Sequence, residues 1–316
     1  MRRFLLFVKI SSLVLASCVS ALDFFVSPSS GVATLSSNDG STPEKAFQNL
    51  DLAKAAVRKA VPSMKEDIMV HIADGLYSLD APLNFTSADS GQLGHTVRWK
   101  ATGANAIISG GTKVEGWTLV NETTGIYSAQ VPKGLRSRNL FVNGWAANYA
   151  RRMIHRKDFK YSNFSMTWNS SGYDWLMTTP GIFNAEVRAI NSFTDRYAPI
   201  ESVGDRELVM KQFSWKNNII GYDTIPLPNA DFGMWVQNAL GLLHEGGQHY
   251  LDSDEGIVYY MPLAGEDMTK VETFLGRLEA LITIGGTYDD PAHDIAFLGM
   301  NFVSKRMSPR SWYNLL

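Results

Sequence analysis

EALITIGGTYDDPAHDIAFLGMNF, residues Glu279–Phe302, is the stretch that decides the fold class predicted from this sequence. It contains two short apolar segments, Leu281–Ile284 and Ile295–Phe302, separated by a polar turn with a proline. Such strand–turn units normally come in series, because one unit cannot bury its own apolar faces. We therefore interpret the stretch as one rung of a stacked β-structure and expect further rungs elsewhere in the chain.

Similar short segments, rich in Val and Ile and separated by Gly, Asp or Asn, occur near the start of the chain. They are IMVHIADGLYSL (68–79), PLNFT (82–86), HTVRWKAT (95–102) and AIISGGT (106–112). The pattern is typical of the rungs of a parallel β-helix, although an antiparallel sandwich gives a similar one. We expect parallel strands near 68–72, 96–100 and 106–109.

A helix is predicted in front of these strands, over residues 43–61. Ser41 and Glu44 fit a capping box, and the apolar residues that follow recur at helical spacing until Pro62 ends the pattern. We expect this helix to cap the N-terminal end of the stack.

The middle of the chain has longer strands that are predicted to pair as hairpins. These segments are GWTLVNETTGIYSAQVP (116–132), RNLFVNGWAANYARR (138–152) and GQHYLDSDEGIVYYMPL (247–263). Asn143-Gly144 is typical of a tight two-residue turn. The sequence therefore predicts short rung-like strands after residues 1–21, a block of antiparallel strands in the middle of the chain, and a return to rung-like strands near its end.

The first 21 residues have the features of a secretory signal peptide: Arg2 and Arg3, then an apolar run, then small residues at Val19-Ser20-Ala21. Lys9 interrupts the apolar run, which argues against a membrane-spanning helix. We expect a secreted, extracellular protein. An alternative stays open, because Leu15–Cys18 also resembles a bacterial lipoprotein box in which Cys18 would carry lipid.

Four N-x-[ST] sequons, at Asn84, Asn121, Asn163 and Asn169, favour a eukaryotic secretory route and predict glycosylation. Cys18 is the only cysteine, so the mature chain has neither a disulfide nor a thiol nucleophile. The formal net charge is −2, and no basic patch indicates binding to nucleic acid.

The opening segments FFVSPSSG (24–31) and SSNDGSTPEKAFQNLDLAKAAV (36–57) resemble the N-terminal cap of secreted right-handed parallel β-helix proteins of the pectin-lyase-like superfamily. A longer, ordered series of motifs resembles glycoside hydrolase family 141. These motifs are HTVRWKATGANAIISGGTKVEGW (95–117), GIYSAQVPKGLRSRNLFVNGWAANYARR (125–152), YYMPLAGEDM (259–268) and LEALITIGGTYDDPAHDIAFLGMNF (278–302). The resemblance implies an all-β fold that follows a signal peptide (1–21). In this fold a right-handed parallel β-helix begins with an N-terminal cap and rungs (22–115), accommodates an inserted antiparallel β-sandwich-like module (116–277) and then resumes with a further rung (278–316).

In that family the resumed β-helix continues for many rungs, and these later rungs carry the catalytic carboxylates. The present sequence ends at Leu316, soon after the first resumed rung. We therefore expect a truncated solenoid without the catalytic rungs, and no glycosidase activity from this chain alone.

Glycosidic cleavage normally requires a pair of carboxylates on either side of the scissile bond. Asp289, Asp290 and Asp294 are the catalytic candidates, since they lie close together in one segment. The alternative is that Asp-Asp-Pro forms a turn between rungs. These oxygens could also hold calcium, as in polysaccharide lyases. Elsewhere no histidine, cysteine or acidic spacing predicts a metal site.

Arg151, Arg152 and Trp312 are the candidates for substrate binding. Arginine forks suit the carboxylates of acidic sugars, and an exposed tryptophan can stack on a sugar ring. The alternatives are a structural ion pair for the arginines and core packing for the tryptophan.

Three functions are compatible with these observations, and all of them have a polysaccharide or oligosaccharide as the partner. The first is a glycoside hydrolase of plant or algal cell-wall polysaccharide. The second is a non-catalytic carbohydrate-binding or surface protein. The third is a polysaccharide lyase, which would need calcium and a basic residue as the proton acceptor.

Overall fold

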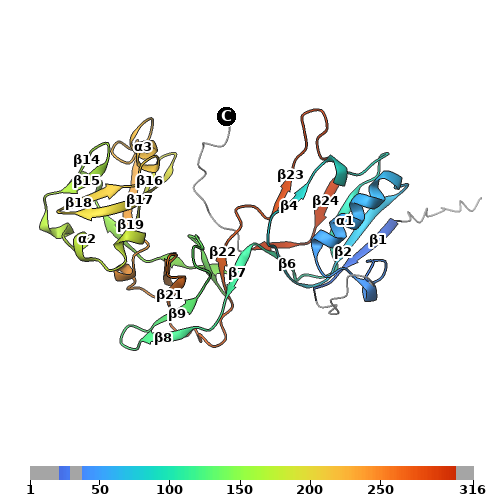
Figure 1. Ribbon diagram of the computed structural model, residues 1–316, viewed down its shortest axis with the longest axis horizontal. Coiled ribbons are helices and arrows are strands. Elements are labelled where there is room, and N and C mark those ends of the chain that lie inside the picture. Colours follow the sequence, from blue (N-terminus) through green and yellow to red (C-terminus); the bar gives the residue numbers. More distant parts are fainter. Residues whose placement is uncertain (1–20, 29–37, 304–316) are drawn as a thin grey trace, which may run out of the picture. The chain divides into compact units, whose positions relative to one another are not determined.

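The computed structural model describes residues 21–28 and 38–303 (Figure 1). Residues 1–20 of the predicted signal peptide, with Cys18, lie outside the described residues, and so does Trp312. The chain is mostly β, as predicted, with both parallel and antiparallel sheets. Within the described ranges, no helix has the length and apolar character that crossing a membrane requires.

Contacts between residues divide the chain into two compact units. Of the described residues, unit 1 consists of 21–28, 38–77, 84–106 and 284–300, and unit 2 consists of 78–83, 107–283 and 301–303. The domains expected from the sequence, with boundaries at 115/116 and 277/278, stay a prediction.

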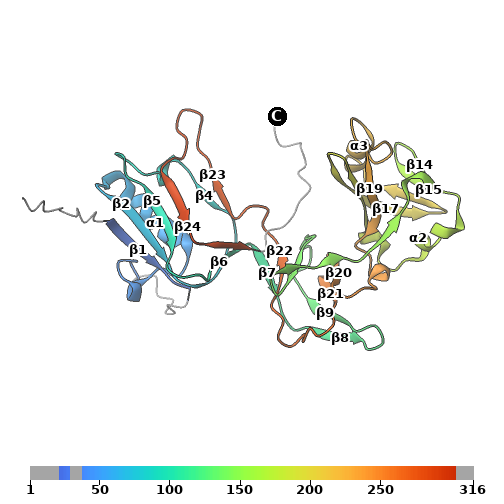
Figure 2. The ribbon, with the colours of Figure 1, turned by 180° about the vertical axis from the view of Figure 1, so that it is seen from behind.

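Unit 1 is built on a four-stranded parallel sheet with the strand order β1–β2–β5–β24 (Figure 2). Its strands are β1 (Ala21–Val26), β2 (Asp67–Ile72), β5 (Val97–Ala101) and β24 (Ile295–Leu298). The strands predicted at 68–72 and 96–100 are confirmed as β2 and β5, and they pair in parallel. Side chains along β2 alternate between half-buried and buried, which is the period of two expected for a sheet with one face in the core.

Successive strands of this sheet pair without a shift in register. Trp99 of β5 is the partner of Val70 on one side and of Phe297 on the other. A slip by one residue would turn every inward side chain to the opposite face. The unshifted pairing therefore keeps one continuous buried face from strand to strand.

Three aromatic rings form the centre of this buried face. Phe85 meets both of the others edge to face, with ring centroids 5.4 Å from Trp99 and 5.1 Å from Phe297. Phe85 and Trp99 are almost completely buried. Such aromatic pairs contribute about 0.5–1.5 kcal/mol each beyond the burial of their area. The cluster therefore anchors β24 to strands that precede it by almost two hundred residues.

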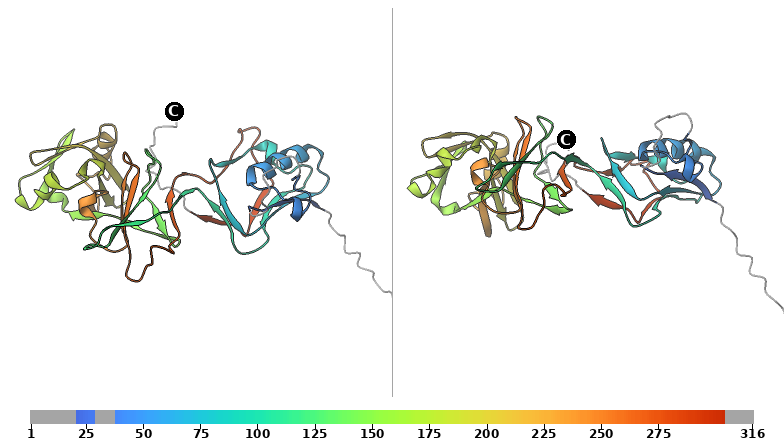
Figure 3. Two further views of the ribbon diagram at one scale, coloured as in Figure 1. Left: turned by 60° about the horizontal axis from the view of Figure 1, so that its bottom comes forward. Right: turned by 90° about the horizontal axis from the view of Figure 1, so that it is seen from below.

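Helix α1 (Leu50–Ala60) packs against the sheet of unit 1, and Figure 3 shows it in blue from two further directions. It buries Leu50, Ala53 and Val57, which lie on one face at helical spacing. The predicted helix over 43–61 is therefore confirmed only for its second part.

The predicted start of this helix is wrong. Residues Pro43–Lys45 form a separate 3₁₀ turn, and the N-cap of α1 is Asn49, whose side chain accepts a hydrogen bond from the Leu52 N–H at 2.9 Å. Phe47 lies between the two helices in an isolated parallel bridge to Val26, and its N–H donates to the Phe25 carbonyl at 2.8 Å. This pairing holds residue 47 in extended backbone, so the helix begins after it.

Unit 2 contains three sheets whose strands pair antiparallel, except for the parallel pair β12–β20. Their strand orders are β11–β10–β22–β7, β12–β20–β21–β9–β8 and β13–β19–β16–β17–β18–β15–β14. The strands are β7 (Gly111–Val114), β8 (Thr118–Asn121), β9 (Ile126–Gln130), β10 (Leu140–Val142), β11 (Trp145–Ala146), β12 (Asn148–Tyr149), β13 (Arg151–Ile154), β14 (Phe159–Tyr161), β15 (Ser165–Trp168), β16 (Glu186–Asn191), β17 (Asp195–Gly204), β18 (Glu207–Met210), β19 (Asp231–Gln237), β20 (Gln248–Asp252), β21 (Ile257–Met261) and β22 (Thr273–Gly276). The three predicted hairpins within 116–277 are confirmed as β8–β9, β10–β11 and β20–β21.

The remaining elements are short. The other strands are β3 (Gly75–Ser78), β4 (Leu83–Phe85), β6 (Ala106–Ser109), β23 (Ile282–Ile284) and β25 (Asn301–Val303). The other helices are α2 (Trp175–Thr178), α3 (Ser214–Ile219) and the 3₁₀ turns η1 (Pro43–Lys45), η2 (Val61–Ser63), η3 (Ser87–Asp89), η4 (Arg156–Asp158), η5 (Ser171–Tyr173), η6 (Ile182–Asn184) and η7 (Leu240–Leu242). The strand predicted at 106–109 is β6, and it pairs in parallel with β25.

The first and last strands of the antiparallel region lie side by side. β7 pairs with β22, and Gly111 is the register partner of Gly276. Thr273, which is fully buried, donates its hydroxyl to the Val114 carbonyl at 2.7 Å and accepts from the Trp117 indole N–H at 2.9 Å. Backbone and side-chain hydrogen bonds therefore join the two ends of the segment between these strands.

Asp89 supports unit 1 from the end of η3, where it is 1% exposed. Its carboxylate accepts from Nε and Nη2 of Arg58 at 2.9 and 2.5 Å and from the Thr86 N–H at 2.9 Å. Burial alone would raise the pKa of Asp89, but these hydrogen bonds and the charge of Lys54 outweigh burial and hold the pKa below its ordinary value. The contribution of Asp89 to stability is therefore complete above the unfolded pKa and is lost as the pH falls through the folded pKa.

We predict that Asp89→Asn lowers the free energy of unfolding of unit 1 by about 2 kcal/mol at pH 7, because it weakens hydrogen bonds to a charged group. Hydrogen exchange of the β2 and β5 amides measures this locally. Acidification below about pH 4 should lower the protection of these amides, relative to their intrinsic exchange rate at the same pH, more in the wild type than in the variant. Asp51→Asn, an exposed change on α1, the helix that carries Arg58, should cost less than about 1 kcal/mol. Equal exchange rates in wild type and Asp89→Asn would contradict the assignment.

Candidate functional site

The three predicted catalytic aspartates lie on the exposed loop between β23 and β24. Asp290 takes part in a turn, in which its N–H donates to the Thr287 hydroxyl and its carbonyl accepts from the Thr287 N–H, both at 3.0 Å. Asp294 contacts His293, with 2.9 Å between the carboxylate and Nδ1. Among the described residues, no cluster of three or more His, Cys, Asp or Glu side chains has the arrangement of a metal site. These contacts fit the turn alternative for Asp289 and Asp290, and a catalytic role for the three aspartates stays a prediction.

The two predicted substrate-binding arginines, on β13, each stack on a tryptophan. The Arg151 guanidinium carbon lies 5.5 Å from the ring centroid of Trp235, and that of Arg152 lies 4.5 Å from the ring centroid of Trp175. Cation–π contacts of this kind contribute about 0.5–2 kcal/mol. Both arginines thus have a stabilising partner within unit 2, and their contact with a substrate stays a prediction.

A polar hollow of unit 2 had no counterpart in the sequence analysis. We name it the Arg138 cavity, and its volume is about 260 Å³. Its charged and aromatic lining consists of Arg136, Arg138, Tyr149, Phe183, Glu186, Lys211 and Asp254. The loop after β9, the end of η6, the start of β16, the end of β18 and the β20–β21 turn all contribute to it. Residues more than one hundred positions apart therefore converge on one small volume.

A buried ion pair forms the floor of this cavity. Arg138 donates Nε and Nη2 to the two carboxylate oxygens of Glu186, at 2.8 and 2.6 Å. Gln237 donates a further hydrogen bond to Glu186 at 2.8 Å. Burial alone would lower the pKa of Arg138, but the contacts with Glu186 raise it above its ordinary value. Three donated hydrogen bonds, two from Arg138 and one from Gln237, therefore hold the Glu186 carboxylate in place.

Aromatic rings fix the guanidinium of Arg138 in place. Its central carbon lies 4.7 Å from the centroid of the Tyr197 ring. Tyr149 donates its hydroxyl to the Ser137 carbonyl, and burial raises the pKa of this tyrosine. Tyr149 also stacks on His249, with ring centroids 4.6 Å apart. The floor of the cavity is thus rigid, which favours recognition of a ligand over large rearrangement.

The rim of the cavity is charged and contains one exposed ring. Arg136, Lys211 and Asp254 are exposed, and Phe183 is 67% exposed. An exposed aromatic ring beside convergent polar groups is a feature of ligand sites rather than of ordinary surface. The cavity therefore has the chemistry of a binding site, with hydrogen-bond donors, charge and one apolar surface.

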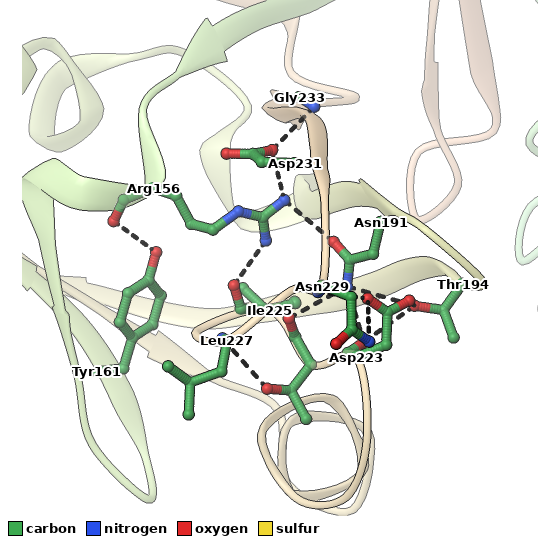
Figure 4. Close-up of polar contacts among 11 residues, drawn as sticks. Arg156, Tyr161, Asn191, Thr194, Asp223, Ile225, Leu227, Asn229, Asp231 and Gly233 are labelled. Atoms are coloured by element: carbon green, nitrogen blue, oxygen red, sulfur yellow. Dashed lines mark hydrogen bonds and ion pairs between the residues drawn. The ribbon is translucent and has the colours of Figure 1, made fainter.

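A second hollow in unit 2, about 950 Å³ and more open, is lined in part by Arg156. Figure 4 shows the polar contacts of this arginine. Arg156 is 7% exposed and donates to the Ile225 carbonyl at 2.6 Å, to Asn191 Oδ1 at 3.0 Å and to Asp231 at 2.8 Å. The hydrogen bond from Arg156 is the main cause that lowers the pKa of Asp231.

Asp223, drawn in the same view, ties the neighbouring loop together (Figure 4). Its carboxylate accepts from the N–H groups of Phe193 and Asn229, both at 2.9 Å, and from the Thr194 hydroxyl at 3.1 Å. The polar groups around Arg156 are thus directed at the protein itself. We interpret this network as the anchor of the 220–231 loop and the Arg138 cavity as the candidate ligand site.

One feature of the sequence could have predicted part of the Arg138 cavity. Glu186 begins a strand in which buried and half-buried residues alternate, and a carboxylate at such a position needs a cationic partner. The basic segment KGLRSR (133–138) supplies one, but the distance of 48 residues between Arg138 and Glu186 hides the pairing.

Comparison with known proteins found a clear similarity in fold to a solved structure. No family model matches the chain, and no curated protein matches it. A solved structure titled "Glycoside hydrolase" matches with a TM-score of 0.69 and 21% sequence identity, over 90% of this chain and 51% of that one. A second, "The complex structure of XylC with xylose", matches with a TM-score of 0.35 and 10% identity, over 91% of this chain and 36% of that one. The first likeness establishes a shared fold, and the chain spans about half the length of that structure.

We predict that Arg138→Met lowers the free energy of unfolding by about 3–5 kcal/mol, because it leaves Glu186 buried without its cation. Adding Glu186→Gln should restore part of this loss, since the orphaned charge is then removed. Chemical denaturation measures both. Lys133→Met removes the exposed pair of Lys133 with Glu255 and should change stability by less than about 1 kcal/mol. An Arg138→Met variant as stable as Lys133→Met would show that the pair is not a structural anchor.

Proposed function

We propose that this chain belongs to a secreted carbohydrate-active protein of the glycoside hydrolase type, whose parallel sheet is part of a right-handed parallel β-helix. The observation that carries the proposal is the unshifted return of β24 onto β5, in a chain whose fold matches the structure titled "Glycoside hydrolase". The motif resemblance to glycoside hydrolase family 141 supports the same assignment. A plant or algal cell-wall polysaccharide is the proposed target.

Within this protein, unit 2 would bind sugar at the Arg138 cavity. Three features support this role. The cavity is small, its lining is dominated by polar and charged side chains, and Phe183 offers an exposed apolar ring at its rim. The faces of sugar rings carry C–H groups that pack on aromatic rings, while their hydroxyls take up polar donors and acceptors. The pairing of Glu186 with Arg138 leaves binding, rather than acid–base catalysis, as the role of the cavity.

The two alternative functions would require different features of the protein. A polysaccharide lyase would need bound calcium and a basic proton acceptor near it. A non-catalytic carbohydrate-binding or surface protein would need the cavity alone. In either case the binding of sugar to unit 2 is shared, so a binding measurement tests the common part first.

We predict that the chain binds cell-wall oligosaccharides and that Phe183→Ala weakens this binding about fivefold or more, because an apolar contact at the rim is lost. Isothermal titration calorimetry against a panel of pectic and hemicellulosic oligosaccharides measures it. Phe193→Ala is the matched control, since Phe193 is as exposed but does not line the cavity. Equal losses in both variants, or no binding to any sugar, would contradict the proposal.

The same preparations test catalysis. We expect no release of reducing sugar from these oligosaccharides. Release that is lost in Asp289→Ala or Asp294→Ala would instead place a catalytic carboxylate on the β23–β24 loop.

Secretion leads to a separate prediction. Asn163 and Asn169 are exposed in unit 2, and Asn84 is exposed on β4. In a eukaryotic secretory host the mature chain should begin near Leu22 and lose mass on enzymatic removal of N-glycans, with smaller losses in Asn163→Gln and Asn169→Gln. Intact-mass spectrometry measures this. A product that begins with a lipid-bearing Cys18 and carries no glycan would support the lipoprotein alternative.

A further inference from the structure

We propose that the Arg138 cavity selects an acidic sugar unit, whose carboxylate or sulfate group is held by Lys211 and by the open edge of Arg138. The inference rests on the proposed sugar binding and adds the class of sugar that the cavity prefers.

The charge balance of the lining is the first argument. Three cationic side chains, Arg136, Arg138 and Lys211, face two carboxylates, Glu186 and Asp254. Arg138 and Glu186 neutralise each other through their two-point contact. The remaining lining is positive by one charge, on a protein whose overall formal charge is −2. A local excess of positive charge in a concave site favours an anionic ligand.

The donors of Arg138 are the second argument. Glu186 occupies Nε and Nη2, while Nη1 makes no hydrogen bond to any residue in the described part of the chain. The ring of Tyr197 fixes the orientation of the guanidinium plane. Arg138 therefore has a second edge that is already oriented, and planar oxyanions such as a carboxylate, or the oxygens of a sulfate ester, match such an edge.

Lys211 is the third argument. Its backbone is held on both sides, since its N–H donates to the Pro199 carbonyl at 2.9 Å and its carbonyl accepts from the Trp215 N–H at 3.0 Å. Its ammonium group has no partner among residues 21–28 and 38–303. A lysine with an anchored backbone and an unpaired head at the rim of a cavity is suited to reach over a bound anion as a point charge.

The cavity offers fewer groups that could recognise the hydroxyls of a neutral sugar, and this favours an acidic sugar further. The amide of Asn238, which lines the same cavity, donates to the Asn184 carbonyl at 2.9 Å and accepts from the Leu251 N–H at 3.1 Å. Its amide nitrogen and its amide oxygen are thus each already engaged in one hydrogen bond within the protein. Discrimination between sugars would therefore come mainly from the charged substituent.

The experiment compares matched pairs of ligands by calorimetry on the full chain at low salt. One pair is trigalacturonate and its methyl ester, and the other is a sulfated galactan trisaccharide and its desulfated form. We expect the charged member of a pair to bind about tenfold or more tightly than the neutral one, and added salt to reduce the difference. The pair with the larger difference identifies the anionic group as carboxylate or sulfate.

Variants assign the effect to the cavity. Lys211→Gln should weaken binding of the charged ligand about tenfold and leave the neutral one unchanged, whereas Lys216→Gln, an exposed lysine of α3 outside the cavity, should change neither. Asp254→Asn should tighten binding of the charged ligand. Equal binding of charged and neutral members would overturn the inference and leave the proposed sugar binding intact. Equal losses in Lys211→Gln and Lys216→Gln would overturn it as well, and the absence of binding to all four ligands would overturn both proposals.

Discussion

The packing of Phe297 against Phe85 and Trp99 is the contact on which the architecture depends. It fixes β24 on β5 in parallel register, although the chain leaves this sheet after Ala101 and returns only at Ile295. The entropic cost of closing so long a loop grows only slowly with its length, so one well-buried cluster is enough to hold the return strand. The chain between β5 and β24 must therefore start and end at fixed places. Within unit 2, its early strand β7 pairs with its late strand β22, so these two parts of the chain lie side by side.

The Arg138–Glu186 pair has a comparable role on a smaller scale. It connects the loop after β9 to the first residue of β16, and so links the five-stranded and seven-stranded sheets of unit 2. A buried pair of this kind gives little net stability compared with apolar packing, yet it is costly to break. It therefore specifies where the loop sits, and the loop in turn brings Arg136 to the cavity. The ion pair that holds the loop and the lining of the cavity therefore share the same residues.

Local patterns in the sequence were sufficient for much of the fold. Short apolar segments rich in Val and Ile, separated by turn residues, predicted β2 and β5. Asn143-Gly144 predicted the β10–β11 hairpin, and both residues adopt the positive φ angles, 48° and 82°, that a tight turn requires. The start of α1 could not be found in this way, since the pairing of Phe47 with Val26 is a tertiary contact that overrides a local capping signal. The candidate site was missed for the same reason. Its residues come from segments whose spacing carries no periodic signal, and only the folded sheets bring them together.

The partnership of Gly111 with Gly276 has a consequence for how such a protein can change over evolutionary time. The region between Gly111 and Gly276 starts and ends on neighbouring strands of one sheet, β7 and β22. A gene segment that encodes this region therefore begins and ends at the same place in the fold. Insertions succeed where both ends are close together and already hydrogen-bonded. Recombination at this position can therefore exchange the region between these two glycines for another, or change its length, while the parallel strands on either side keep their register.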